Sequence, residues 1–181
     1  MKAWRMLLLA LLTPLLGGCL VAFDAPLPAN QAAPQALLGK WTSKDAWGEH
    51  LSLEISRAGT DRYLAVSYPK GQKKVRDQVA FTVSRHGSRW YASARMPAEY
   101  GGHYAIAGFE LADDGALRVY NLDVERIAQA VQQRALSGTP FDTKAGDGVL
   151  VSSQLDQVFA YLDDPANSDV FTEIARYQRA K

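Results

Sequence analysis

The chain has 181 residues, of which 48% are hydrophobic and 22% are charged, and its formal net charge is +1. This composition is that of an ordinary globular domain and excludes a disordered chain, while the near-zero charge excludes a nucleic-acid binder driven by bulk charge. The single cysteine excludes an internal disulfide and any metal site with several thiolate ligands.

The N-terminus has the order of features found in an export signal. Lys2 and Arg5 form a short basic head, an apolar run follows over 6–16, and two glycines precede Cys19. The run is too short to span a bilayer permanently, and no second apolar stretch follows it. We therefore predict that residues 1–18 are a removed signal peptide.

The end of this signal, Leu16-Gly17-Gly18-Cys19, resembles the lipobox of bacterial lipoproteins. The resemblance implies that Cys19 becomes the first residue, carries a diacylglyceryl group and is acylated on its amine with a chain such as palmitate. Several acyl chains at about 0.8 kcal/mol per buried methylene hold a protein on a membrane stably. The resemblance thus implies a membrane partner reached through Cys19.

The residues after Cys19 indicate which membrane holds the protein and how the anchor is linked to the folded domain. Leu20 and Val21 follow the cysteine where lipoproteins of the inner membrane often carry Asp, so the family rule favours the outer membrane with the domain facing the periplasm. Residues 20–36 are rich in Ala and Pro and have no period. We predict that 19–36 form the acylated N-terminus and a flexible tether to a folded domain over 37–181.

The body of the chain begins with short runs that alternate apolar and polar residues and end in turn residues. This pattern predicts strands joined by short connections, and thus an antiparallel up-and-down sheet that closes to hide its edges. Seven consecutive strands are expected, at 38–44, 51–56, 64–68, 79–84, 89–96, 103–111 and 117–122.

The period changes after residue 122. Apolar residues at helical spacing predict amphipathic helices near 124–136, 154–163 and 168–179. The segment 139–147 is expected to be a loop, and Val149 to Val151 is the candidate eighth strand. The expected fold is therefore mainly β, an eight-stranded antiparallel barrel with additional C-terminal α-helices.

The first strand opens with Gly39-Lys40-Trp41, which resembles the Gly-x-Trp of lipocalins. Lipocalins and their relatives are eight-stranded meander barrels that bind small apolar ligands. The resemblance implies that Gly39 and Trp41 form a structural plug at the closed end of the barrel. It also implies an arginine from a late strand over the tryptophan, for which Arg118 is the candidate.

The antiparallel order places every second connection at the same end of the barrel. If Trp41 marks the closed end, the connections at 45–48, 69–74, 97–102 and 123–147 surround an open mouth. Alanines near Trp90 leave room either for a cavity or for a bulky neighbour, and the sequence does not choose between them. The candidate ligand-binding residues of the mouth and interior are Trp47, Tyr68, Trp90, Tyr100 and His103.

No pattern of catalytic or metal-ligating residues stands out. His50 and His103 could meet a carboxylate such as Glu49 or Glu99 across the mouth, but surface histidines at strand ends are the commoner interpretation, so no metal site is predicted. We expect neither a cofactor nor enzymatic activity. The basic residues Lys70, Lys73, Lys74 and Arg76 are interpreted as a solvated loop.

The function favoured by these patterns is non-catalytic binding of a small apolar or lipid-like ligand by a membrane-anchored periplasmic lipoprotein. The alternative is an accessory lipoprotein of the envelope, with a filled barrel, that docks a protein partner through its helices or its outer wall. An exposed apolar patch on those helices would favour this second hypothesis.

Overall fold

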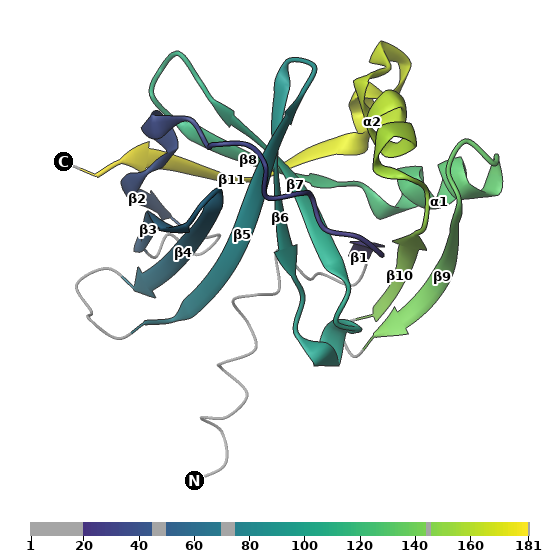
Figure 1. Cartoon of the computed structure of the whole chain (residues 1–181), viewed down its shortest axis with the longest axis horizontal. Helices are drawn as coiled ribbons and strands as arrows, with labels where there is room; N and C mark the ends of the chain where they lie inside the picture. Colours follow the sequence, from purple (N-terminus) through teal and green to yellow (C-terminus); the bar gives the residue numbers. More distant parts are fainter. Residues whose placement is uncertain (1–19, 45–49, 70–74, 144–145, 181) are drawn as a thin grey trace, which may run out of the picture.

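Eight strands of the chain close into an antiparallel barrel (Figure 1). The computed structural model describes residues 20–44, 50–69, 75–143 and 146–180. Each barrel strand pairs with the next along the chain, and β11 closes the ring by pairing with both β8 and β2. The barrel strands are β2 (Gly39–Lys44), β3 (His50–Gly59), β4 (Arg62–Pro69), β5 (Asp77–His86), β6 (Arg89–Arg95), β7 (Tyr104–Leu111), β8 (Leu117–Leu122) and β11 (Phe171–Arg179).

The predicted fold class is thus confirmed, and the seven expected strands are present in the expected order. The alternation was informative because each of these strands turns one face to an apolar cluster and runs antiparallel to its neighbour in sequence. Short turns such as Ala112 to Gly115, which closes with a backbone hydrogen bond of 2.8 Å, join the strands.

The eighth barrel strand is not the one expected. Val149 to Val151 belong to β10 (Gly146–Val151), which forms a hairpin with β9 (Gly138–Thr143) outside the barrel, where 139–147 was expected to be a loop. The predicted helix at 168–179 is wrong: a 3-10 turn at Pro165–Val170 leads into β11. A helix there would leave the edges of β2 and β8 unpaired, and tertiary pairing overrides the local period.

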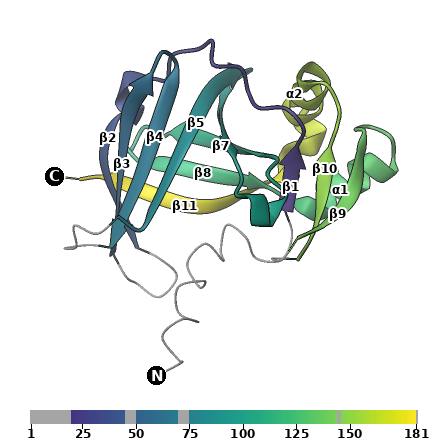
Figure 2. The ribbon, with the colours of Figure 1, turned by 60° about the horizontal axis from the view of Figure 1, so that its bottom comes forward.

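The N-terminal segment corrects the prediction of a tether over 19–36. Leu20–Phe23 form strand β1, which pairs in parallel with β10 and meets β7 at Tyr104. From β1 the chain runs extended across the barrel to the short 3-10 turn at Gln35–Leu37 (Figure 2). Leu27 and Leu37 are buried, so from Leu20 onward the segment is part of the folded domain.

Hydrogen bonds fasten this extended segment to two strands of the barrel, β4 and β5. The Thr82 hydroxyl donates to the Leu27 carbonyl at 2.8 Å. The Arg85 amide donates to the Gln31 side chain at 2.6 Å, and the Ala33 amide donates to the Tyr63 hydroxyl at 2.7 Å. Because such side-chain contacts leave no period in the sequence, composition alone gave the impression of a linker.

Two α-helices cover one outer side of the barrel. They are α1 (Val124–Gln132), which begins at an Asp123 N-cap that accepts from the Arg126 amide, and α2 (Leu155–Asp163). Both lie within ranges expected to be helical. Another 3-10 turn at Ala98–Tyr100 follows β6. None of the helices in the described ranges has the length and hydropathy needed to cross a bilayer.

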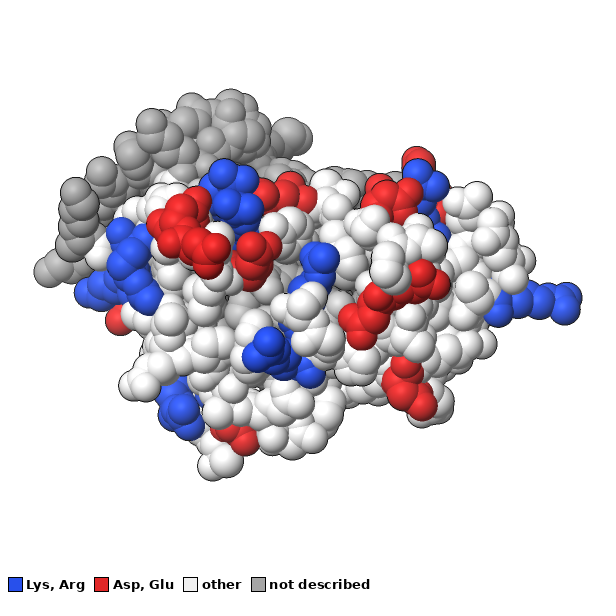
Figure 3. Space-filling view, turned by 90° about the horizontal axis from the view of Figure 1, so that it is seen from above, with Lys and Arg blue, Asp and Glu red and all other residues white. Residues whose placement is uncertain are grey.

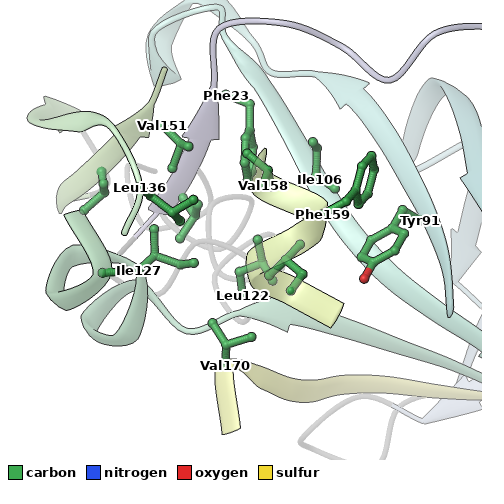
Figure 4. Close-up of a cluster of buried hydrophobic side chains, with 14 of the residues drawn as sticks. Phe23, Tyr91, Ile106, Leu122, Ile127, Leu136, Val151, Val158, Phe159 and Val170 are labelled. Atoms are coloured by element: carbon green, nitrogen blue, oxygen red, sulfur yellow. The ribbon is translucent and has the colours of Figure 1, made fainter. Parts of the chain in front are cut away.

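The helices and the β1/β10 pair form a dense core against the outer wall of the barrel. Figure 4 shows Tyr91, Ile106 and Leu122 of the wall facing Phe159, Val158 and their neighbours. We call this the outer core; its buried members are Val21, Phe23, Leu27, Tyr91, Ile106, Leu122, Ile127, Ala130, Leu136, Val149, Val151, Val158, Phe159, Leu162 and Val170.

Candidate ligand-binding site in the barrel

One end of the barrel is closed by Trp41. Its side chain is 1% exposed, and its indole N–H donates to the Leu37 carbonyl at 2.9 Å. The Arg179 guanidinium lies 4.0 Å from the centre of the Trp41 ring and donates to the carbonyls of Leu38 and Ala36. Cation–π attraction and these hydrogen bonds bind the last barrel strand to the first.

Gly39 is required at this end of the barrel. Its φ is +115°, a conformation that favours glycine, and a Cβ there would lie 2.8 Å from the Arg179 Nη1 atom.

The expectation that Arg118 covers Trp41 is wrong. Arg118 projects from the outer wall, where it lies 3.5 Å from Asp114. Arg179 was missed because its strand has apolar residues at helical spacing.

The inner wall of the barrel is apolar and aromatic. Tyr63 and Phe81 are cross-strand neighbours with ring centres 5.7 Å apart, and Trp90 stacks on Phe109 at 6.0 Å. We call the cluster around Trp41 the inner core. Its buried members are Ala33, Leu37, Trp41, Ile55, Tyr63, Val83, Phe109 and Leu117, and its partly buried members are Leu38, Leu53, Ala65, Phe81, Trp90, Ala92, Leu111, Val119 and Tyr177.

Small residues line one side of this inner wall. Ala92 pairs with Ala107 across β6 and β7, and Ala94 pairs with Ala105 one step further from the closed end. All four alanines are partly exposed. Side chains inside a closed barrel lose contact with solvent when the lumen is filled. These small side chains therefore leave more room on this side of the inner wall than large residues would, although Ala105 also packs against the cluster that contains Met96 and Tyr100.

The neighbouring strand β5 is also exposed near the open end. Val79 alternates with Phe81 on the face of β5 that carries Val83, pairs with Ala65 across β4, and is 42% exposed. Pairing between β5 and β6 ends at Phe81 and Ala94, so Val79 lies beyond the last contact of these two strands. The lumen thus has an apolar wall that side chains of the described residues leave partly uncovered.

The structure separates the residues expected to bind the ligand. Trp90 lies on the inner wall but near the closed end, since β6 begins there. Tyr68 lies on the opposite face of β4 from Tyr63 and Ala65, and therefore faces outward. Trp47 lies outside the described residues.

Tyr100 and His103 lie together, but away from Trp90. Tyr100 is 8% exposed and packs with Leu20, Ala22 and Met96 in a third small cluster. The His103 imidazole lies 3.7 Å from the Asp24 carboxylate and edge-on to Phe141. These two residues therefore fix β1 to the connection between β6 and β7.

A second hollow lies on the outside of the barrel. It has a volume of about 560 Å³ and runs between Pro26–Ala29 and the outer wall, where Ala80, Ser93 and Arg95 line it. Tyr63 and Phe81 of the inner core also contribute to its lining. The Ser93 hydroxyl is buried and has no hydrogen-bond partner in the described ranges. We call this hollow the outer groove. It is the other place where a ligand could bind, so an experiment has to distinguish it from the lumen.

Charged side chains of both signs occur together on the surface. In the view from above, basic and acidic side chains are interspersed over the visible face (Figure 3). Within the described part of the chain there is no cluster of three residues suited to hold a metal ion. His86, which contacts the Asp163 carboxylate, instead stacks on Phe159 at 4.4 Å and so joins the tip of β5 to α2.

Burial raises the pKa of four tyrosines, Tyr91, Tyr120, Tyr161 and Tyr177, and two of these belong to the buried cores. Burial raises the pKa of Tyr91 to about 12, with the Asp163 charge adding to the effect, and its hydroxyl has no partner among the described residues. Burial also raises the pKa of Tyr177 on the inner wall, against a smaller opposing effect of the Arg76 charge. Both phenols stay neutral at pH 7.

Comparison with known proteins adds no further constraint: no family model, curated protein or solved structure matches the chain.

Proposed function

We propose that the chain is a lipid-anchored protein of the bacterial outer membrane whose periplasmic barrel binds a small apolar or lipid-like ligand without catalysis. One observation carries the binding proposal. Inner-wall residues such as Ala92 and Val119 line a closed barrel and yet remain partly exposed. Apolar surface of this kind, enclosed on most sides, is what a small apolar ligand covers favourably.

The anchor proposal rests on the signal-like segment that ends at Cys19. Because β1 begins at Leu20, an acyl group on Cys19 would lie next to the folded domain rather than at the end of a long linker. The barrel would then be held close to the membrane surface. A lipid-like ligand would have only a short path between the bilayer and the mouth.

Replacement of Cys19 tests the anchor. We expect wild-type protein in the membrane fraction with the mass of an acylated Cys19, and Cys19→Ser protein without acylation, as measured by fractionation and intact-mass spectrometry. A wild-type chain with an unmodified thiol would refute the anchor and leave the binding proposal standing.

Binding in the lumen is tested with a fluorescent apolar probe and two matched substitutions. Ala92→Phe fills space on the inner wall, and Ala80→Phe fills the outer groove on the neighbouring strand. We expect probe binding to fall at least tenfold in Ala92→Phe and to be unchanged in Ala80→Phe, with thermal unfolding confirming that both variants fold. The reverse result would place the ligand in the outer groove, and an absence of binding to the wild type would refute the proposal.

The alternative of partner docking has less support. In the described part of the chain, the large hydrophobic residues that are exposed are Val75, just before β5, and Val79, within β5, and neither lies on a helix. The helices α1 and α2 turn their apolar sides into the outer core.

A further inference from the structure

A small polar cluster interrupts the apolar inner wall where β5 begins. Ser67 and Asp77 face each other across β4 and β5, and the Ser67 hydroxyl lies 3.4 Å from the Asp77 carboxylate. Arg76 precedes Asp77, and its backbone amide donates to the Ser67 carbonyl at 2.8 Å. Alternation from Phe81 and Val83 places Asp77 on the inner face of β5, so the cluster lies on the inner side of the open rim, where the Asp77 side chain is 39% exposed.

The Arg76 side chain turns into the barrel rather than into solvent. It is 18% exposed, and its Nε atom lies 3.6 Å from the inward-facing Asp77 carboxylate. Its charge also acts on the Tyr177 hydroxyl, which belongs to the inner wall of β11 on another side of the barrel. The burial of the guanidinium and its closeness to the inward-facing Asp77 carboxylate place it on the inner side of the rim, and its electrostatic effect on Tyr177 agrees with this position. The expected solvated loop is therefore wrong for Arg76, while Lys70, Lys73 and Lys74 lie outside the described residues.

One end of this guanidinium has no hydrogen-bond partner among the described residues. The Arg76 Nη2 atom is buried and has no hydrogen-bond partner in the part of the chain that the structure describes. The adjacent carboxylate of Asp77 lies on the Nε side at a distance longer than a hydrogen bond. A buried charged donor without an acceptor is costly, and an anionic oxygen is the group that satisfies it best.

We propose that Arg76 binds the anionic head group of a single-chain lipid whose apolar tail lies along the alanine-lined inner wall. This inference rests on the proposed function and gives the ligand its chemical class: a carboxylate or phosphate oxygen at Arg76, and an unbranched chain beside Ala92 and Ala107. Arg118 offers a matched control, because its Nε atom is likewise buried and unpartnered in the described ranges but its side chain projects from the outer wall.

Competition against a neutral fluorescent probe tests this assignment. Palmitate and hexadecanol have the same chain and differ in the charged head group, and a lysophosphatidate adds a phosphate head. We expect palmitate to bind wild-type protein about 10- to 100-fold more tightly than hexadecanol, the size of a charged hydrogen bond. The ratio of palmitate to lysophosphatidate affinity then identifies which anionic head group Arg76 prefers.

Substitution of Arg76 completes the test. In Arg76→Met we expect palmitate affinity to fall to that of hexadecanol while hexadecanol affinity is unchanged, Arg76→Lys to restore part of the preference, and Arg118→Met to behave as wild type. If Arg76→Met does not fold, the wild-type ratio of palmitate to hexadecanol still decides the question.

The outcomes separate this inference from the proposed function. Equal affinities for palmitate and hexadecanol in a protein that binds the neutral probe would overturn the head-group assignment and leave the proposed function standing. A preference for palmitate that survives in Arg76→Met would also overturn the assignment to Arg76. If wild-type protein binds neither the probe nor any lipid, the proposed function and the inference fail together.

Discussion

The outer core and the inner core are built from the same strands but packed differently. Among the described residues the outer core has 15 buried members and 7 partly buried ones. The inner core has 8 buried members and 9 partly buried ones. The dense packing that stabilises a domain thus lies mainly outside the barrel, between its wall and the helices.

The outer face of the barrel wall thus supplies most of the stabilising packing, and the inner face supplies less. In β6, Tyr91 faces the outer core and is fully buried, while its neighbour Ala92 faces the lumen and is partly exposed. A barrel that is stabilised from outside does not need to fill its own interior. The lumen can then remain available to a ligand.

The largest expected effect comes from truncating a ring in each core. Phe159→Ala removes a buried ring that contacts His86 and Tyr91, and should lower the free energy of unfolding by about 3–5 kcal/mol. Phe81→Ala on the inner wall should cost about 1–2 kcal/mol, because the ring already contacts solvent. Urea unfolding measures both, and equal losses would contradict the division between the cores.

The closed end of the barrel should give the next largest effect. Arg179→Met removes hydrogen bonds to Leu38 and Ala36 and the cation–π contact with Trp41, and should lower the free energy of unfolding by about 2 kcal/mol. Arg118→Met on the outer wall should cost less than about 1 kcal/mol. Equal losses in the two variants would show that Arg179 does not brace this end.

Alkaline pH probes the outer core through Tyr91. The folded-state pKa of about 12 lies above the ordinary value of 10.0, so between these values the unfolded chain releases a proton that the folded chain keeps. The free energy of unfolding should therefore fall with rising pH, by up to about 1.4 kcal/mol between pH 9 and pH 11 from this group.

Tyr91→Phe isolates that contribution from the other tyrosines. Since the Tyr91 hydroxyl has no partner in the described residues, the variant should be as stable as wild type or slightly more stable at pH 7. Its loss of stability between pH 9 and pH 11 should be smaller than that of the wild type. Parallel alkaline losses in the two proteins would contradict the burial of the Tyr91 hydroxyl.

The smallest effect is expected where the outer core meets solvent. The contact between His86 and Asp163 is partly exposed, with side-chain exposures of 44% and 31%. Asp163→Asn should therefore change the free energy of unfolding by only about 0.5 kcal/mol in urea unfolding at pH 7. A loss several times larger would mean that the tip of β5 is held to α2 by charge rather than by the stacking of His86 on Phe159.

The sequence was most informative where each strand pairs with its neighbour along the chain. The strands between Gly39 and Leu122 alternate clearly because each turns one side to an apolar cluster. β1 and β11 were missed because their partners are distant in sequence: Leu20 pairs with Gly148, and Arg179 pairs with Trp41. Val170, Phe171, Ile174 and Tyr177 fit a helical stripe, and only the open edges of β2 and β8 require a strand there.

The candidate site was only partly predictable for a related reason. Gly39 and Trp41 could be selected from a local motif, and the alanines near Trp90 from alternation. Arg179 depended on a strand that the helical period concealed. Arg76 follows several lysines in the sequence, and composition cannot indicate that one cation just before a strand turns inward.

The central claim is that the lumen, rather than the outer groove, holds the ligand, and a crystal structure of the protein soaked with a brominated fatty acid tests it most directly. The account predicts anomalous bromine density beside Ala92 and Ala107, with the carboxylate at Arg76. Bromine density confined to the groove beneath Pro26–Ala29, or a lumen filled by the protein's own side chains, would contradict it.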